Sequence, residues 1–255
     1  MKSENQSGIF QVSGSLYLQP KGTTKCSMTL PLGICLAAAL LVNGVILHAA
    51  DNPASQSPVI WRMDRTDEIS GHATTVLGSP KVVSTSEGKA VHFDGVTDGL
   101  FLSANPLEGF ATFTIEVLFK PESDGPAAQR FLHLEDSEGS RLMMETRLVD
   151  HRWALDTFLY SAKTKGRQPL LDPTKLHPAD QWTWVALVYA NGHMAHYING
   201  VKELEGEVAF TPMLPGKISL GVRQNKVYWF KGGMREIRFH PVALTDEQLQ
   251  RVPAE

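Results

Sequence analysis

Apolar and polar residues alternate along several short segments of the chain. In 113–119 the odd positions are large and apolar, so they share one side of an extended strand, and Thr114, Glu116 and Leu118 fall on the other. Similar segments predict further strands at 90–93, 131–134, 141–149, 153–159, 184–189, 194–198, 217–222 and 234–239. Strands at this spacing, with no helices between them, predict an all-β fold: a two-sheet antiparallel β-sandwich.

Local signals add one hairpin and one helix to this scheme. Asn199-Gly200 separates two strand-like segments, and both positions of a two-residue hairpin turn require a positive φ, which Asn and Gly tolerate. Thr245 and Gln248 form the ends of a capping box, which predicts a short helix ending at Gln250. Helical periodicity is otherwise nearly absent.

Residues 1–50 have the pattern of an N-terminal signal helix. A polar lead precedes an apolar run from 30 to 49, and the run ends in small residues, Ala49-Ala50, where a signal peptidase would cleave. The chain is therefore expected to be secreted, periplasmic or displayed at the cell surface. Two alternatives stay open: the segment is retained as a membrane anchor, or translation starts at Met28. Polar residues inside the run weaken the anchor, because a spanning helix needs about 20 apolar residues.

Removing residues 1–50 changes the charge and the cysteine content. The rest of the chain has 21 Lys and Arg against 26 Asp and Glu, a net charge of −5. This balance lacks the basic surface that nucleic acid requires, so we expect no nucleic-acid partner. Both cysteines lie in the removed segment, which excludes a disulfide and a thiolate zinc site. Residues 51–58 are expected to be a flexible lead and 59–250 a single domain.

A series of landmarks along the chain resembles a known family. In order, they are KAVHFDGVTD at 89–98, FTIEVLFKP at 113–121, WTWVALVY at 182–189, YING at 197–200, LG at 220–221, FKGGMREIRF at 230–239 and ALTDEQL at 243–249. Together they are similar to the laminin-G-like domain of the concanavalin A-like lectin/glucanase superfamily, from about Val59 to Leu249. The resemblance implies a concanavalin A-like jelly roll. That fold carries lectins, adhesion modules and glycosidases alike, so function has to be argued from the site.

The segment from Asp94 to Asp98 has two interpretations. In the simpler one it is a turn, where Gly95 takes a positive φ and the two carboxylates accept hydrogen bonds from loop amides. The resemblance implies the other: a structural calcium ion held by Asp94 and Asp98, since calcium prefers oxygen ligands. Arg235 stands where the family usually has an acidic residue, which argues against the metal. No other cofactor is expected.

Three glutamates alternate along one predicted strand. Glu203, Glu205 and Glu207 have the spacing of carboxyl groups that share a strand face, and glycoside hydrolysis needs two carboxyls about 5–9.5 Å apart. However, they directly follow the Asn199-Gly200 turn, and Gly206 interrupts them. We therefore favour a solvated, charged hairpin face that protects a sheet edge.

A second polar set falls on strands that line one face of the predicted sandwich. Alternation along 141–149 turns Glu145 and Arg147 away from the core, and we expect both to point outward. Nearby segments complete the candidate ligand-binding set: His133, Glu145, Arg147, Asp156, Arg223 and Trp229. Mixed charges beside aromatic rings suit a sugar, whose hydroxyls and C–H faces they contact. The alternative is a set of cross-strand ion pairs on a solvated face.

The sequence thus favours a secreted, non-catalytic binding or adhesion module for extracellular carbohydrate. A glycan-cleaving enzyme of the same fold and a structural protein-interaction domain of a surface assembly are the alternatives. The expected partner is an extracellular glycan or a surface protein, with a membrane only if the N-terminal segment is retained. Trp182 and Trp184 are expected to divide between core and surface, and neither is expected to contact ligand.

Overall fold

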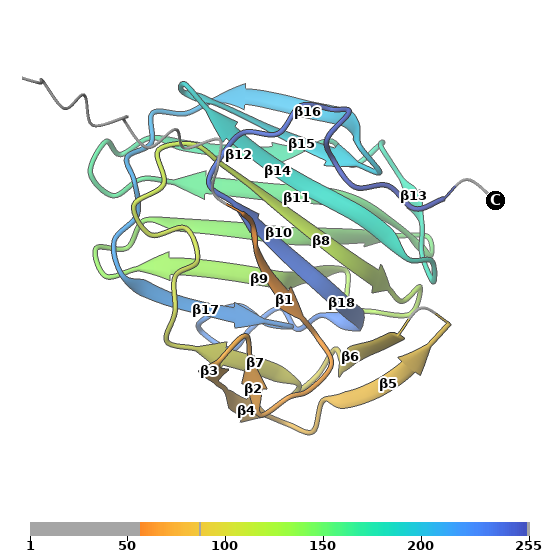
Figure 1. Cartoon of the computed structure of the whole chain (residues 1–255). Helices are drawn as coiled ribbons and strands as arrows, with labels where there is room; N and C mark the ends of the chain where they lie inside the picture. The colour runs from red at the N-terminus through yellow and green to blue at the C-terminus, as the bar shows by residue number, and fades with distance from the viewer. Residues whose placement is uncertain (1–56, 87, 254–255) are drawn as a thin grey trace, which may run out of the picture. The chain divides into compact units, whose positions relative to one another are not determined.

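The computed structural model describes residues 57–86 and 88–253, so the predicted signal segment lies outside the described residues. Within these ranges the chain forms 18 strands, and most of them build two antiparallel sheets that pack face to face (Figure 1). The same ranges contain no helix long and apolar enough to cross a membrane. The predicted all-β sandwich is confirmed.

The first sheet, sheet I, contains eight strands. In spatial order they are β16 (Val201–Glu207), β15 (His193–Ile198), β14 (Thr183–Ala190), β8 (Phe113–Pro121), β18 (Lys231–His240), β6 (Gly88–Asp94) and β5 (Lys81–Thr85), and β1 (Val59–Arg62) pairs with β18. Each of the strands predicted at 90–93, 113–119, 184–189, 194–198 and 234–239 lies in this sheet.

The second sheet, sheet II, also contains eight strands. In spatial order they are β12 (Arg167–Leu171), β11 (Arg152–Tyr160), β10 (Arg141–Val149), β9 (Ala128–Asp136), β17 (Gly216–Leu220), β7 (Gly99–Leu102) and β4 (Thr75–Leu77), and β13 (His177–Pro178) pairs with β11. A small hairpin of β2 (Glu68–Ile69) and β3 (His72–Ala73) stands apart. The remaining predicted strands lie in sheet II.

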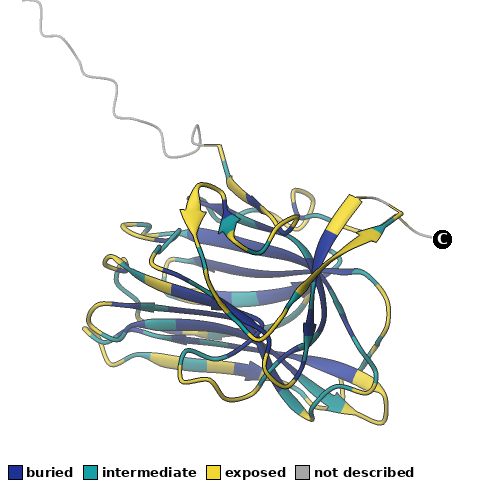
Figure 2. Ribbon diagram, turned by 90° about the horizontal axis from the view of Figure 1, so that it is seen from below, coloured by how far each residue is buried: buried dark blue, intermediate teal, exposed yellow. Residues whose placement is uncertain are grey.

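The core fills the space between the two sheets, and the strand periodicity explains how. Alternate residues of β8, including Ile115 and Phe119, point inward and are fully buried. The Phe119 ring stacks on Phe131 of sheet II at 4.6 Å between centroids and meets Trp153 edge-on at 5.1 Å. Aromatic contacts of this kind join the sheets. Figure 2 shows the result, with buried strands in two layers and exposed residues at the turns and edges.

The hairpin turn is confirmed, whereas the predicted helix is wrong. Asn199 and Gly200 have φ angles of 47° and 71°, as the turn requires. After Thr245 the chain makes only turns, although the Gln248 side chain does accept a hydrogen bond from the Thr245 amide at 2.9 Å. The helix does not continue because the Gln250 amide donates to the Glu116 carboxylate, at 2.6 Å, instead of to a helical carbonyl.

Residues 241–253, which we call the C-terminal strap, lie against the outer face of sheet I. Leu249 packs in a small apolar cluster with Ala186, Val188 and Tyr197 of β14 and β15. The buried Glu116 carboxylate accepts from the Gln250 amide and contacts His240 Nε2 at 2.9 Å. The strap therefore covers part of an outer sheet face that would otherwise meet water.

Candidate binding groove and the predicted site residues

Three of the predicted site residues meet on the outer face of sheet II. Glu145 of β10 lies opposite Asp156 of β11, and Arg147 Nη2 contacts both carboxylates, at 3.0 Å from Glu145 Oε2. Arg130 of β9 joins them, with its Nη2 2.9 Å from the same Glu145 oxygen. The four side chains form a connected ion-pair network, in keeping with the cross-strand ion pairs of the alternative interpretation.

The network is buried, which differs from the expected solvated face. The Glu145 residue is 2% exposed, and the loop 222–229 places the Tyr228 ring 3.8 Å from the guanidinium of its partner Arg130. A β-bulge between Met144 and Glu145 brings Arg130 opposite Glu145. Burial and the neighbouring Asp156 carboxylate raise the pKa of Glu145, and the two arginines offset only part of that rise.

The other three predicted residues are separate from the network. His133 is buried, and its Nδ1 accepts a hydrogen bond from the Gln224 amide of the same loop at 3.0 Å. Burial, together with surrounding cations such as Arg223, lowers the pKa of His133 to about 3. Arg223 is half-buried in the loop, and the Trp229 ring packs beside Gly99 at the start of β7. The structure thus brings together Glu145, Arg147 and Asp156 as a network and leaves His133, Arg223 and Trp229 outside that network.

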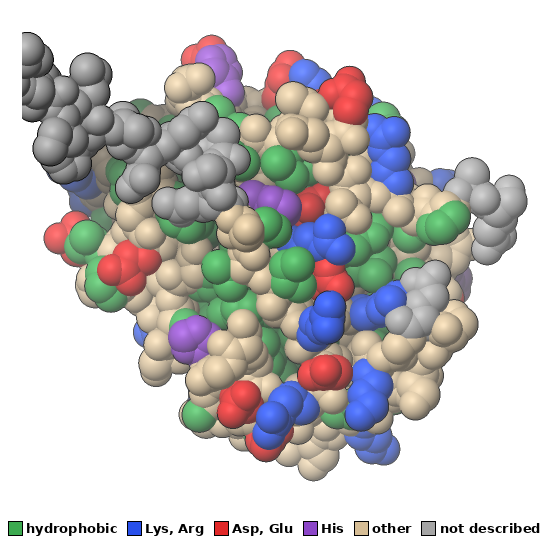
Figure 3. Space-filling model, viewed as in Figure 1, with side chains coloured by type: hydrophobic (Ala, Val, Ile, Leu, Met, Phe, Trp, Pro, Cys, Tyr) green, Lys and Arg blue, Asp and Glu red, His purple; other side chains and the backbone are tan. Residues whose placement is uncertain are grey.

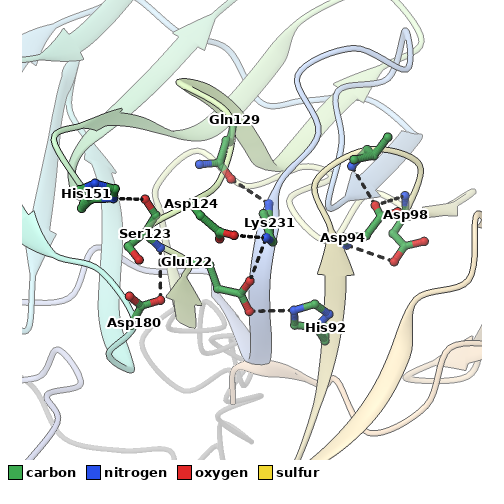
Figure 4. A network of polar contacts seen from close by, with 11 residues as sticks. His92, Asp94, Asp98, Glu122, Ser123, Asp124, Gln129, His151, Asp180 and Lys231 are labelled. Carbon is green, nitrogen blue, oxygen red and sulfur yellow. Dashed lines mark hydrogen bonds and ion pairs between the residues drawn. The ribbon is translucent and has the colours of Figure 1, made fainter.

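Asp94 and Asp98 serve the loop that follows β6. Asp94 accepts hydrogen bonds from the amides of Val96, Thr97 and Asp98 and from the Thr97 hydroxyl, at 2.8–2.9 Å. Burial raises its pKa, but these four hydrogen bonds outweigh burial and hold the pKa at about 2. The Asp98 carboxylate accepts from the amides of Ser79 and Asp94 (Figure 4). The turn interpretation accounts for every one of these contacts.

These two carboxylates do not fit a calcium site. The oxygens of Asp94 and Asp98 already accept hydrogen bonds from loop amides. Lys81 and His92 line the same hollow, so a bound cation would lie near the positive Lys81 and the hydrogen-bonding ring of His92. Within residues 57–86 and 88–253, no group of three or more His, Cys, Asp or Glu side chains is arranged to hold a metal ion. We therefore derive no role for a metal.

The glutamates of β16 do not share one face. Glu205 is exposed and pairs with Lys202, as a solvated hairpin face requires, but the Glu203 side chain is only 8% exposed. His196 and Tyr197 of β15 pair with Leu204 and Lys202, so Glu203 is the extra residue of a bulge in β16, which breaks the alternation there. The Glu203 carboxylate lies 2.7 Å from His177 Nε2 and 3.3 Å from His196 Nε2. The expectation of a solvated face is therefore wrong for Glu203.

These contacts change the acidity of Glu203. Burial alone would raise its pKa, but the hydrogen bonds and charge of His177 and His196 outweigh burial and hold the pKa at about 2. His196 in turn contacts the Thr157 hydroxyl of sheet II, at 3.0 Å from its Nδ1. This polar cluster joins the two sheets at the edge where β16 and β12 approach each other.

A groove lies on the outer face of sheet I, where the strap leaves the face uncovered. Its volume is about 780 Å³, and it is bordered by Trp182, Trp184, Leu118, Lys120, Arg235 and Arg251. Leu118 and Lys120 belong to the outer positions of β8, and Arg235 is the extra residue of a bulge in β18. Arg251 and the two residues after it form the wall that the strap provides. We call this hollow the groove.

The two tryptophans both line this groove, although Trp184 is 8% exposed and Trp182 is half-buried, so the expected division holds for their burial but not for the face on which they lie. Residues two apart on a strand share a face, and both indoles line the hollow. Trp182 is half-buried and lies directly over Gly233 of β18, whose missing side chain leaves room for the ring. The Arg238 guanidinium sits 5.0 Å from the centre of the Trp184 ring. The spacing of Trp182 and Trp184, two residues apart, was the signal in the sequence that could have located the groove.

Two further hollows adjoin the groove and share residues with it. One, of about 310 Å³, shares Lys120 and Trp182 and adds His92 and Glu122. The other, of about 430 Å³, shares Arg235 and adds Arg62 and Lys89. His92 Nε2 contacts Glu122 Oε1 at 2.8 Å, and Lys231 Nζ binds Asp124 at 2.6 Å beside it (Figure 4). The hollows thus form a continuous depression across the outer face of sheet I.

Two packed antiparallel sheets in this order define a jelly-roll sandwich of the concanavalin A-like type. Residues 94–250 match the laminin-G-like family described as "Concanavalin A-like lectin/glucanases superfamily", and the chain belongs to that family. No curated protein sequence matches the chain.

Several solved structures share this fold. Domain 4 of AbnA, an extracellular arabinanase from Geobacillus stearothermophilus solved with arabinotriose, aligns at a TM-score of 0.56 and 22% identity, over 74% of this chain and 94% of that domain. The binding domain of botulinum neurotoxin serotype D aligns at 0.55 and 13% identity over 75% of this chain. The receptor-binding domain of type G aligns at 0.57 and 8% identity over 76%. The chain spans half the length of each toxin domain, and identities this low establish the fold alone.

Proposed function

We propose that the protein is a carbohydrate-binding module and that the groove on sheet I holds the sugar. The observation that carries this proposal is the groove itself, in which Trp182 and Trp184 lie beside Lys120 and Arg251. Indole rings stack on the C–H faces of sugar rings, and amine and guanidinium groups donate hydrogen bonds to sugar hydroxyls. The hollow therefore offers both halves of sugar recognition in one place.

The proposal includes an extracellular location, with an extracellular glycan or a surface glycoprotein as partner. The signal pattern in residues 1–50 supports export of the chain. The arabinanase domain, solved with arabinotriose, offers a precedent for a sugar ligand on this fold. The toxin domains, named for binding and for receptor binding, are a precedent for recognition at surfaces.

Two carboxylates of the adjoining hollows are held in ion pairs, which supports binding of a sugar without its hydrolysis. Glu122 is paired with His92 and Lys231, and Glu236 is paired with Arg238. A glycosidase needs one carboxyl to donate a proton and a second to attack or to activate water, about 5–9.5 Å from the first. A carboxylate held in an ion pair with a cation stays ionised, so it is a poor proton donor.

A glycan array, run beside an assay for released reducing sugar, tests the proposal. We expect retention of one class of glycan and no released sugar. With the best glycan in calorimetric titration, Trp182→Ala should weaken binding about tenfold, the cost of one stacking surface of about 1.4 kcal/mol. Trp229→Ala, which removes an indole packed against β7 of sheet II, is the matched control and should bind as the wild type does.

Each other outcome points to a different function. Loss of binding in Trp229→Ala or Arg147→Ala, with Trp182→Ala unaffected, would place the sugar on the outer face of sheet II, where the sequence first suggested it. Release of reducing sugar would indicate an enzyme. If no glycan on the array bound, and urea titration showed that the protein was folded, a protein partner would be favoured. Urea unfolding of every variant separates lost binding from lost folding.

A further inference from the structure

We infer that the groove selects acidic polysaccharides, which carry carboxylate or sulfate groups, over neutral ones. This inference rests on the groove being the sugar site. It adds the charge of the ligand, which the shape of the groove and its tryptophans do not specify.

Cations without acidic partners surround the groove. Lys120 lies in the groove itself, and Arg62 and Lys89 line the adjoining hollow of about 430 Å³. Within residues 57–86 and 88–253, none of the three makes an ion pair or a side-chain hydrogen bond. Arg251 contributes a fourth cation: its Nη2 donates to the backbone oxygen of Asp246, and Glu247 interacts with its charge without forming an ion pair in the described ranges. Four positive groups thus face solvent along one depression.

Two of the acidic groups around the depression are paired with cations. Glu122 is 2.8 Å from His92 and 3.7 Å from Lys231, and Glu236 is paired with Arg238. The Asp180 carboxylate, at the groove rim, accepts the Ser123 amide and keeps its charge. Among the described residues, Asp180 and Asp64 line the hollows without an ion-pair partner. The cations therefore outnumber the anions that could offset them.

This positive depression stands out because the chain beyond residue 50 has a net charge of −5. Figure 3, which faces sheet I, shows Lys and Arg side chains gathered over the region of β18, β6 and β5. A local excess of one sign in a hollow concentrates ligands of the other sign and raises their association rate. A neutral sugar would gain nothing from it.

The placement of the cations also matches a polymer. Lys120 and Arg251 border the groove, whereas Arg62 and Lys89 border a second hollow that shares Arg235 with it. A chain that carries a negative group on successive sugars could meet one cation after another while one of its rings stacks on Trp182. Guanidinium groups bind carboxylate and sulfate oxygens in pairs, so both kinds of acidic sugar fit.

The test compares ligands that differ only in charge. An oligogalacturonate and its fully methyl-esterified form share one sugar backbone, and a heparin-derived oligosaccharide supplies sulfate. We expect the oligogalacturonate or the sulfated oligosaccharide to bind at least about tenfold more tightly than the ester, and the difference to shrink as NaCl rises from about 50 mM to about 500 mM. The preferred acid tells carboxylate from sulfate recognition.

Charge-neutral variants locate the effect. Lys120→Gln and Arg62→Gln should each reduce affinity for the acidic ligand about three- to tenfold and leave affinity for the ester unchanged. Lys217→Gln, an exposed lysine on β17 of sheet II, is the matched control and should change neither.

Three results would overturn the inference. If the ester bound as tightly as the acid, the groove would be a sugar site without charge selection, and the proposed function would stand. If Lys217→Gln weakened acidic binding as much as Lys120→Gln, the effect would come from charge in general. If none of the oligosaccharides and no glycan on the array bound, the proposed function would fail first, and this inference with it.

Discussion

The buried Glu203 carboxylate should contribute strongly to stability, and Glu203→Gln measures that contribution. Gln keeps the shape of the side chain between His177 and His196 but removes its charge. Folding lowers the pKa of Glu203 from 4.5 to about 2. At about 1.4 kcal/mol for each tenfold change in a protonation constant, the charged form stabilises the folded state by about 3 kcal/mol. Because its side chain is only 8% exposed, solvent screens little of this.

The pH dependence has a definite sign. A carboxylate with a lowered pKa stabilises the fold fully above its unfolded pKa, near 4.5, and loses that effect as pH falls towards about 2. Glu203→Gln should therefore be about 3 kcal/mol less stable than wild type at pH 7, and this deficit should fall to about half by pH 3 and vanish only below about pH 2. His133, whose pKa is about 3, titrates in the same range, but it is present in both proteins and cancels in the difference.

Urea titration followed by tryptophan fluorescence, at several values from pH 3 to pH 7, gives the required free energies of unfolding. The control is Glu205→Gln, two residues along the same strand, where the carboxylate is 65% exposed and paired with Lys202. It should change stability by less than about 0.5 kcal/mol throughout. Equal effects of the two substitutions, or a Glu203→Gln deficit that stays constant down to pH 3, would refute the reasoning.

Three further predictions concern the network, the strap and the hairpin. Arg147→Ala should lower the free energy of unfolding, measured with urea, by about 2–3 kcal/mol. The loss should be larger at pH 8 than at pH 5, because burial raises the pKa of Glu145 and protonation at the lower pH removes the charge that the variant leaves unpaired. Unchanged stability would contradict the buried network. Leu249→Ala should cost about 2 kcal/mol and expose the strap to limited proteolysis, whereas equal protease resistance would mean that Leu249 does not hold it. Asn199→Ala should cost about 1–2 kcal/mol in thermal unfolding, since Asn199 has a φ of 47° and accepts the Trp184 amide; an unchanged midpoint would count against the turn.

Much of the fold could be predicted because its central strands are amphipathic in the right period. Every strand expected from alternation is present, including β10 at 141–149 with the expected bounds. The strands that escaped prediction are short or lie at sheet edges. β5, at Lys81–Thr85, is almost wholly exposed and has no apolar face for a pattern to show.

The site was harder to predict, because its geometry depends on tertiary contacts. Alternation correctly placed Glu145 and Arg147 on one side of β10, but only the fold shows that Glu145 is buried there and that Tyr228 packs on its partner Arg130. Bulges cannot be seen in a period of two, and one of them turns Glu203 away from the face of Glu205. The groove draws its walls from segments far apart in the chain, which a local pattern cannot join.

The strap gives the groove a kinetic property as well as a wall. Its first residues are held by hydrogen bonds between Thr114 and the backbone at Val242 and Leu244. Its later part is attached by Leu249 in a small apolar cluster and by the bond from the Gln250 amide to Glu116, which is much less than what holds the sheets together. Segments held by few contacts detach by local opening, at a lower free energy than global unfolding. The Gln250 amide can exchange its hydrogen with solvent only when this bond breaks, so its exchange rate reports how often the wall lifts. A ligand bound against Arg251 should slow that exchange, so the exchange rate of the Gln250 amide would report whether the groove is occupied.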